Sequence, residues 1–389
     1  MSLCIERGVR CDLLLELLIQ PFRARLFGPL EFVLTGLGGD RPGQGSQRIN
    51  QDNMRLIKNA IKILIAYSLH YSGLLSLIKN NRLRDRVCVL AYHRILPDAQ
   101  AAKTNSADAI ITESGLFRKH LKWLKDEFHI IDMQELQAIL LDKQPMSGNS
   151  LLVTFDDGWQ DNFQHARSAL SDEGVPATIF LPYNYIGSGE VFWQEEMLAR
   201  LTQLNESEAE SDRSLLMELA GIEAGAGKAL LRSAVTQLKA KPYTEIYQIL
   251  DRLRAHQQQN AIDMKSDAYM DWQQINQLSK QGISFGSHAL SHRILTQIEL
   301  DEARHEIVES RTLIKQKTGK EVDTIAYPNG NCNSAIEKIV DESGFRLGFT
   351  ISRGYVGRDS NPMALPRFNI HTNNSSSKPL FLCTVLNIF

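Results

Sequence analysis

Short apolar runs alternate with amphipathic segments along most of the chain after residue 86. A short continuous apolar run predicts a buried strand, whereas apolar positions spaced three and four apart predict a helix. Several of the helical segments end on glycine, which is a common helix stop signal. The predicted strands cover residues 87–93, 151–156, 176–182, 282–288, 323–328 and 347–352, and the predicted helices cover residues 114–128, 162–174, 300–319 and 334–344.

This alternation predicts an α/β fold. Strands that are separated by helices form βα units, and such units pair their strands in parallel. A length of 389 residues could hold two or three domains, but a single α/β barrel can also reach this size. Because the chain contains many βα units, we expect a barrel over residues 87–389 more than an open sheet.

The alternation stops after Trp193 and resumes near residue 268. Residues 194–267 are rich in Leu, Ala, Glu, Lys and Gln, which favour helices. We therefore expect a helical insertion that covers one face of the barrel.

The N-terminal part of the chain has a different pattern. Residues 36–53 are rich in glycine and polar residues, and we expect residues 1–53 to be a disordered extension. Because a regular apolar pattern begins at Met54, these residues are also expected to result from the choice of an upstream start codon. We predict a basic amphipathic helix in residues 54–86.

Residues 54–86 combine apolar and basic side chains. This composition suits a helix on an anionic membrane surface, and it suits equally a core helix packed against the barrel. The segment is marginal as a membrane-spanning helix, and it has no small-residue cleavage site. We therefore expect a cytoplasmic or membrane-associated protein more than a secreted one. The basic residues are Arg55, Lys58, Lys62, Lys79, Arg82, Arg84 and Arg86.

Charge and cysteine content exclude two further classes of protein. The formal net charge of -2 gives no electrostatic case for nucleic-acid binding, which needs a concentrated basic surface. The five cysteines are scattered and include no CxxC pair, so neither a zinc ribbon nor a disulfide framework is indicated.

Polar residues follow several of the predicted strands, where α/β folds gather their functional side chains. Asp156 and Asp157 follow one strand, and His288 and His292 follow another in the stretch SHALSH. The four-residue spacing predicts that both imidazoles lie on one face of a helical turn, an arrangement that often binds a divalent metal. Further strand ends carry His93 and the stretch Tyr327, Pro328, Asn329 and Gly330.

One carboxylate and two imidazoles make the three-ligand set of a catalytic zinc site, and Co²⁺ or Ni²⁺ would also suit it. A metal beside the two aspartates would relieve their repulsion, and the second carboxylate could then take a proton from water. A zincin protease is excluded because Ala289 stands where its glutamate would be. The stretch DDGWQDN is out of register for an EF-hand loop.

With both motifs in order, the chain resembles the NodB-type polysaccharide deacetylases. The matching stretches are Thr154–Gly158 (TFDDG), His288–His292 (HALSH) and Ala326–Gly330 (AYPNG), within about residues 87–370. The resemblance implies a deformed (β/α) barrel and a metal-dependent enzyme that removes N-acetyl groups from amino sugars of a polysaccharide or its precursor. The YPNG and YHR forms are similar to the subgroup that acts on poly-N-acetylglucosamine or related exopolysaccharides.

The resemblance also implies roles for individual residues. Asp156 would be the catalytic base, and Asp157, His288 and His292 would hold the metal, with Zn²⁺ expected. The loop of Tyr327, Pro328, Asn329 and Gly330 would line the substrate pocket, and Trp159 and His93 are candidate substrate contacts. For Trp159 and Tyr327, packing in the core is the alternative to stacking on a sugar, and a core role is equally open for His93.

Two positions depart from the family pattern. Ala326 stands where many members have an arginine that orients the base. Arg367 could form an ion pair with a site carboxylate and do that work instead, and an exposed surface charge is the equal alternative. His371 is the one late histidine, but its context does not match the motif of the general acid in the family. Two other functions therefore stay open: a catalytically silent carbohydrate-binding member of a polysaccharide assembly system, and an amide hydrolase of this fold with a non-sugar substrate.

Overall fold

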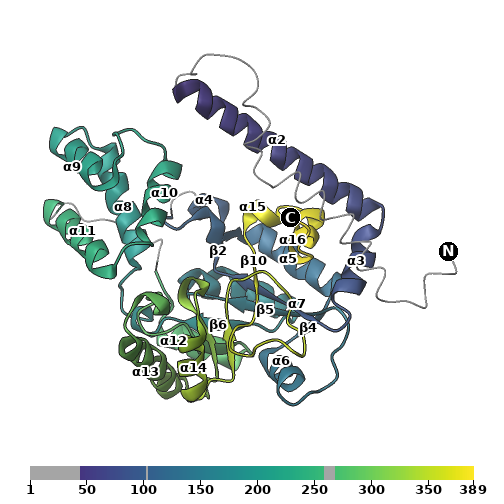
Figure 1. The fold of residues 1–389 in the computed structure, drawn as a ribbon. Helices are drawn as coiled ribbons and strands as arrows, with labels where there is room; N and C mark the ends of the chain where they lie inside the picture. Colours follow the sequence, from purple (N-terminus) through teal and green to yellow (C-terminus); the bar gives the residue numbers. More distant parts are fainter. Residues whose placement is uncertain (1–43, 102–103, 258–267) are drawn as a thin grey trace. The chain divides into compact units, whose positions relative to one another are not determined.

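The computed structural model describes residues 44–101, 104–257 and 268–389 (Figure 1). The chain divides into two compact units. Of the described residues, one unit combines Gln44–Arg84 with Asn374–Phe389, and the other is Asp85–Asn373. The second unit contains the sheets and the residues that the sequence singled out as functional.

The main sheet is parallel throughout. Its strands follow the order β10-β1-β5-β6-β7-β8-β9, and β4 pairs with the first half of β5. A small separate sheet pairs β2 with β3. The strands are β1 (Val87–Tyr92), β2 (Arg94–Leu96), β3 (Ile111–Glu113), β4 (His129–Ile131), β5 (Ser150–Phe155), β6 (Thr178–Leu181), β7 (Ser284–Ser287), β8 (Thr324–Ala326), β9 (Leu347–Phe349) and β10 (Phe368–Asn369).

The continuous apolar runs of the sequence become the centre of this sheet. Every residue of β1 and of β5 is buried, because neighbouring elements cover both faces of each strand. The two strands pair along their whole length, from Val87 with Ser150 to Tyr92 with Phe155. As a result, the residues that follow Tyr92 and Phe155 emerge side by side at one edge of the sheet.

The sheet curls into the expected deformed α/β barrel, with irregular chain between β9 and β10. There, the N–H of Leu365 donates to the carbonyl of Gly348 (2.8 Å), and the N–H of Thr350 donates to the carbonyl of Leu365 (2.9 Å). The N–H of Arg367 then donates to the carbonyl of Ser352 (3.0 Å). These bonds hold the segment before β10 against β9 and the chain that follows it. β10 itself pairs with β1, on the edge of β1 that does not pair with β5.

Helices connect the strands of this unit, as the amphipathic pattern predicts. They are α4 (Asp98–Ala101), α5 (Ser114–Glu127), α6 (Met133–Leu140), α7 (Arg167–Glu173), α12 (Trp272–Lys280), α13 (Leu300–Thr318), α14 (Ser334–Glu342) and α15 (Thr372–Ser375), the last of which ends beyond residue 373. Short turns of 3-10 or π-helix are η2 (Asp108–Ile110), η3 (Asn162–Ala166), η4 (Tyr183–Tyr185), η6 (Leu295–Gln297) and η7 (Pro328–Gly330).

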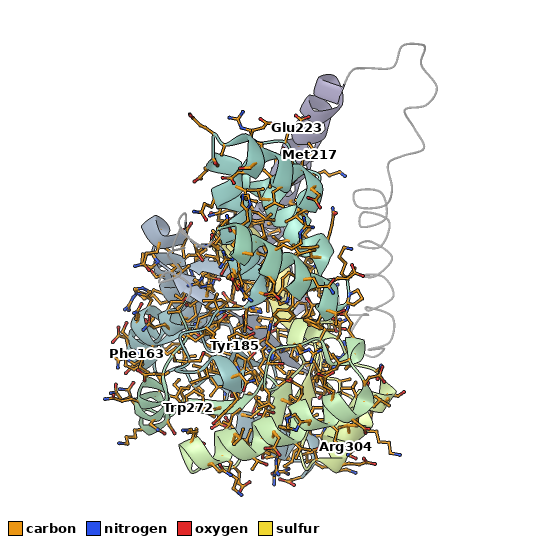
Figure 2. The ribbon with its side chains drawn as sticks, turned by 90° about the vertical axis from the view of Figure 1, so that its left-hand side faces the viewer. Phe163, Tyr185, Met217, Glu223, Trp272 and Arg304 are labelled. Carbon is orange, nitrogen blue, oxygen red and sulfur yellow. The ribbon has the colours of Figure 1, made fainter. Side chains whose placement is uncertain are left out.

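Four helices occupy the region where the alternation stops in the sequence. They are α8 (Trp193–Glu206), α9 (Glu210–Ala220), α10 (Lys228–Leu238) and α11 (Tyr243–His256). Their leucines, with Trp193 and Tyr243, form a hydrophobic cluster of their own. In Figure 2, Met217 and Glu223 mark the outer end of this insertion, away from Trp272 and Arg304 of the barrel. Residues 258–267 lie outside the described part of the chain.

The other unit is helical. It contains α2 (Gln44–Tyr71), α3 (Leu74–Arg82) and α16 (Lys378–Val385), and α2 lies beside α16 (Figure 1). We expected residues 1–53 to be disordered, and residues 1–43 of that segment lie outside the described part of the chain. From Gln44 to Asn53 the structure has helix instead, because an existing helix propagates at little cost through Gln, Arg and Asn.

The C-terminal boundary also differs from the sequence interpretation. The sequence placed residues 374–389 with the barrel, whereas the structure groups them with α2 and α3. Within this unit, the Arg82 guanidinium donates to the carbonyls of Leu386 and Asn387 just after α16. A guanidinium bonded to the last carbonyls of a helix is a favourable C-terminal arrangement, which the local sequence pattern does not reveal.

Candidate active site

The aspartate pair lies in a sharp turn after β5. The N–H of Asp156 continues the strand pairing by donating to the carbonyl of Tyr92 (2.9 Å). The backbone then enters the left-handed region at Asp157 (φ 73°) and Gly158 (φ 66°). The left-handed backbone at position 158 favours glycine, and a Cβ atom there would also crowd the side chains of Ile186 (2.9 Å) and Leu181 (3.0 Å). The turn separates the two carboxylates, which therefore have different partners.

The two histidines of SHALSH lie in an irregular loop, so the predicted helical turn is wrong. Ala289 (φ 63°) and His292 (φ 57°) have left-handed backbone conformations. Glu306 of α13 holds the loop by accepting the N–H groups of Leu290 (2.9 Å) and Ser291 (2.8 Å). A buried carboxylate from a distant helix thus replaces the helical hydrogen bonds. Strained non-glycine backbone of this kind is typical of functional sites.

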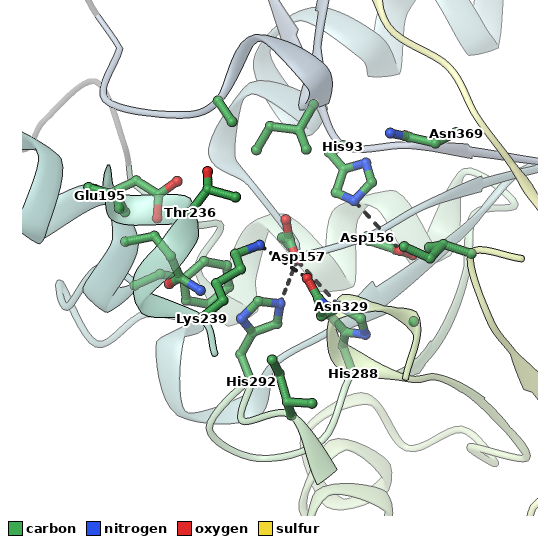
Figure 3. A pocket seen from close by; sticks show the side chains of 18 of the residues that line it. His93, Asp156, Asp157, Glu195, Thr236, Lys239, His288, His292, Asn329 and Asn369 are labelled. Carbon is green, nitrogen blue, oxygen red and sulfur yellow. Dashed lines mark hydrogen bonds and ion pairs between the residues drawn. The ribbon is translucent and has the colours of Figure 1, made fainter. Parts of the chain in front are cut away.

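The structure brings Asp157, His288 and His292 together (Figure 3). The Asp157 Oδ1 lies 3.4 Å from the His288 Nε2 and 3.3 Å from the His292 Nε2. One ligand atom from each of the three residues lies within 4.8 Å of the others. These are the three side chains that the sequence proposes as metal ligands.

Neighbouring groups orient each member of this triad. The Nδ1 of His288 lies 2.7 Å from the carbonyl of Ala326, which selects the tautomer that leaves Nε2 free toward Asp157. The indole N–H of Trp159 donates to the Asp157 Oδ2 (2.9 Å), so Oδ1 is the oxygen that faces the imidazoles. The ring of Phe192 stacks on His292 with centroids 4.0 Å apart.

Trp159 therefore supports Asp157, and its placement does not favour the sugar contact expected from the sequence. The side chain is completely buried. Its ring stacks on Tyr269 (centroids 4.5 Å apart), and the guanidinium of Arg94 lies 4.2 Å from the centroid of its ring. With both faces occupied, the indole is fixed where its N–H reaches the carboxylate.

Burial and mutual contact shift the pKa values of Asp157, His288 and His292. Burial raises the pKa of Asp157, but hydrogen bonds from His288 and His292 outweigh it and hold that pKa well below its ordinary value. Burial lowers the pKa of His292, and the opposing effect of the Asp157 carboxylate is too small to restore it. At His288, burial has the same effect, but Asp157 and Asp156 outweigh it and raise the pKa.

Asp156 is paired with Arg367, as the sequence analysis suggested for the missing arginine. The guanidinium donates two parallel hydrogen bonds of 2.7 Å, one to each carboxylate oxygen. It also donates to the carbonyl of Thr350 (2.9 Å) and to the hydroxyl of Thr154 (3.1 Å), and it is fully buried. Arg367 thus fixes Asp156 from the strand β10 side of the barrel, whereas the family arginine would precede Tyr327.

Burial raises the pKa of Asp156, but the charges of Arg367 and His288 outweigh it and lower the pKa below its ordinary value. His93 lies on the same side of the site, with its Nε2 3.8 Å from the Asp156 Oδ2. Burial lowers the pKa of His93, although both aspartates oppose the change. Tyr92 points the other way and packs on Phe117 and Phe155.

Tyr327 precedes the turn η7, which Pro328, Asn329 and Gly330 form at the edge of the pocket. Tyr327 is fully buried and donates its hydroxyl to the carbonyl of Met363 (2.6 Å), which places its ring in the packing. Asn329 is exposed and has a left-handed backbone (φ 57°). At Gly330 (φ 75°), a Cβ atom would lie 2.7 Å from the backbone nitrogen of Ile351, which requires glycine.

The two aspartates, the two histidines and His93 line one cavity of about 260 Å³, together with Tyr327, Asn329 and Gly330. The insertion forms one wall of it. Lys239, just after α10, reaches across to donate to the Asn329 Oδ1 (3.1 Å), and the buried Glu195 of α8 faces the same space (Figure 3). The insertion residues in this wall are Gln194, Glu195, Leu198, Arg232, Val235, Thr236 and Lys239.

Several of these functional residues have no signal in the sequence. Glu195 and Lys239 reach the site through folding of an insertion that has no recognisable motif, and Phe192 reaches it from the residue just before that insertion. The carbonyl of Ala326 orients His288 through backbone, which any residue could supply. His371 does not line this cavity, and burial and the charge of His93 lower the pKa of its imidazole to about 4.

Known proteins that resemble this chain include members of one family, the polysaccharide deacetylases. The family model for polysaccharide deacetylases matches residues 143–212 and 237–348, and the interruption falls within the insertion. YxkH of Bacillus subtilis, a curated protein named provisionally as a polysaccharide deacetylase, is 21% identical over 290 residues, which cover 74% of this chain and 73% of that protein.

Two solved structures have a similar fold. The Streptococcus pyogenes deacetylase PplD in complex with acetate matches with a TM-score of 0.52 and 18% identity, over 77% of this chain and 98% of that chain. IcaB from Ammonifex degensii matches with a TM-score of 0.51 and 18% identity, over 78% of this chain and 97% of that chain. At this level of identity, the likeness establishes the α/β barrel fold.

Proposed function

The chain belongs to the polysaccharide deacetylase family, and we propose that it hydrolyses N-acetyl groups of amino sugars with a divalent metal held by Asp157, His288 and His292. One observation carries this proposal. The three ligand atoms converge within 4.8 Å, next to a second carboxylate, Asp156, that a buried arginine fixes in place. A base and a metal site side by side are what hydrolysis of an unreactive amide needs.

The donor set suits a metal of the Zn²⁺ type. Ligand atoms at about 2.0–2.1 Å from a tetrahedral Zn²⁺ lie about 3.3–3.4 Å apart. The Asp157 oxygen lies 3.4 Å and 3.3 Å from the two imidazole nitrogens. Three protein ligands also leave a position for water or substrate, which is typical of a catalytic site. Co²⁺ or Ni²⁺ would suit the same ligands.

When bound, such an ion supplies Lewis acidity, which activates water and polarises the acetamide carbonyl. Asp156 is the group that takes a proton from the attacking water, because Arg367 keeps it ionised and aimed at the cavity. The C–N bond then breaks, and the amine nitrogen must gain one proton as acetate leaves. His93, 3.8 Å from Asp156, lies in position to pass to that nitrogen the proton that Asp156 took from water.

The cavity favours an amino sugar as the substrate. Its volume of about 260 Å³ suits one amino-sugar residue. Its rim carries two hydrogen-bonding side chains from separate parts of the chain, Asn329 and Lys239. A polar rim of this kind can bind the hydroxyl groups of a sugar. The match to PplD, whose structure holds acetate, agrees with acetate as the product.

Acetate release tests this function directly. The purified protein would be incubated with chitooligosaccharides and with poly-N-acetylglucosamine, before and after treatment with a chelator, and its metal content would be measured. We expect acetate release that stops on chelation and returns when Zn²⁺, Co²⁺ or Ni²⁺ is added. Binding of these glycans without acetate release would instead support a silent carbohydrate-binding protein, and release only from simple amides would support a non-sugar substrate.

A further inference from the structure

The helical unit exposes an apolar face. On α2, Ile57, Leu64 and Tyr71 are spaced seven residues apart, and Tyr67 lies between the last two, so all four lie along one side of the helix. Ile57 is 56% exposed, Leu64 is 68% exposed and Tyr71 is 80% exposed. Large apolar side chains that line up and face solvent usually mark an interaction surface.

The opposite side of α2 packs within its own unit. Lys62, about half a turn from the apolar face, lies 5.9 Å from the centroid of the Phe389 ring, and α2 packs on α16. Ala66 on that side is completely buried. The apolar face therefore lies on the side of α2 that points away from α16.

A bend separates α2 from α3. Gly73 (φ 75°) begins α3, and the two helices meet at 85°. After this bend, α3 adds Leu77, which is 66% exposed. In the described part of the chain, no single helix has the length and apolarity to cross a membrane, although this bent pair passes the same test when its two helices are taken together.

Charge identifies the partner of this face. Residues 57–84 contain five basic residues and no acidic one. Lys58 and Lys62 are half-buried and Arg84 is exposed, whereas Lys79 is buried and Arg82 bonds the carbonyls after α16. An apolar face with tyrosines, on helices that carry only positive charge, fits the boundary between the headgroups and acyl chains of an anionic bilayer. A protein partner would need no such excess of one charge.

We propose that the face formed by Ile57, Leu64, Tyr67, Tyr71 and Leu77, with Ile63 (45% exposed) at its edge, docks on the surface of an anionic lipid bilayer. The sharp bend suits helices that lie along the surface, because two short segments can each present one apolar side to the same plane. This property goes beyond the proposed deacetylation, since none of the six residues lines the catalytic cavity.

Sedimentation with lipid vesicles tests the proposal on the full-length protein. Vesicles of phosphatidylcholine alone would be compared with vesicles that contain equal parts of phosphatidylglycerol. We expect the protein to sediment with the anionic vesicles, and the bound fraction to fall as salt concentration rises. The double variant Leu64→Asp with Tyr71→Asp should weaken this binding at least about tenfold, because each change places a charge in the apolar face.

A matched control introduces the same charge at exposed polar positions, with Asn59→Asp and Ser76→Asp. This control should keep most of the binding. Both double variants should release acetate from a soluble substrate at the wild-type rate, which separates this test from the test of catalysis. Failure of the wild-type protein to bind anionic vesicles overturns the proposal. So does a Leu64→Asp, Tyr71→Asp variant that binds like wild type, or one whose only change is from dimer to monomer.

Discussion

Asp156 and Asp157 are adjacent in the sequence, yet their surroundings have little in common. Asp156 faces a buried cation, Arg367, which fills both of its oxygens. Asp157 faces two imidazoles through one oxygen and an indole N–H through the other. The left-handed backbone at Asp157 is what directs the two side chains to different partners.

This difference explains how two like charges coexist at the end of a buried strand. Both side chains are almost fully buried, so each would be costly to ionise alone. Separate partners lower the pKa of each carboxyl, with positive charge on one side and imidazole hydrogen bonds on the other. One carboxylate can therefore act as a base while its neighbour acts as a ligand.

Asp156→Asn and His288→Ala test this division most strongly. Asp156→Asn should lower kcat/KM by about 10²–10⁴-fold while the protein keeps its metal, because only the base is lost. His288→Ala should lose both metal and activity. Metal analysis and acetate release on the same samples would check this. Asp359→Asn and His305→Ala are matched controls at exposed positions and should behave like wild type. Loss of metal from Asp156→Asn would show that the two carboxylates share one role.

The substitution Arg367→Lys tests how the surroundings of Asp156 affect catalysis, without changing a contact of Asp157. A lysine cannot form the two parallel hydrogen bonds, so we expect kcat/KM to fall about tenfold or more. Arg367 lowers the pKa of Asp156, and burial alone would raise it. The acid limb of the kcat/KM profile should therefore move to higher pH, and part of the activity should return as pH rises.

The exposed Arg358→Lys serves as the control for this change and should leave the profile in place. Metal content should stay unchanged in both arginine variants, because Arg367 contacts no member of the triad. An acid limb that stays where it is in Arg367→Lys would mean that another group sets the protonation of the base.

The sequence predicts the barrel and the residues of the site better than it predicts the contacts that fix those residues in place. Continuous apolar runs such as β5 dictate buried parallel strands, and strand ends in a parallel sheet meet at one edge, so the convergence of the two aspartates and the two histidines could be predicted. The conformation of the SHALSH loop was not, because Glu306 decides it from 14 residues beyond His292. Spacing alone suggested a helical turn there.

The role of Trp159 was hidden for a similar reason. Its position after the aspartates suggested a sugar contact, but burial between Arg94 and Tyr269 gives it a structural role. Neither neighbour is close to Trp159 in the sequence. The wall that Lys239 and Glu195 form depends in the same way on how the insertion packs on the barrel, which no short motif encodes.

Trp159→Phe examines the Asp157 side with a milder change. It removes the N–H that Asp157 accepts, while most of the ring remains. We expect metal affinity to fall about 10–100-fold, as is usual when a supporting hydrogen bond to a ligand is lost. At saturating metal, kcat should stay near the wild-type value, because Asp156 is untouched. Trp193→Phe, in the core of the insertion, controls for the smaller ring. Unchanged metal affinity would remove the indole from the metal site.

Lys239→Ala should have the smallest effect, because Lys239 contacts Asn329 and neither of the two carboxylates. Loss of one partly exposed hydrogen bond to the pocket rim should raise KM by about two- to tenfold and leave kcat and metal content unchanged. Steady-state acetate release would measure both constants, with the exposed Lys317→Ala as the control. A fall in kcat as large as that expected for Arg367→Lys would place the insertion inside the catalytic apparatus. The site would then have a third functional region, beside the surroundings of Asp156 and those of Asp157.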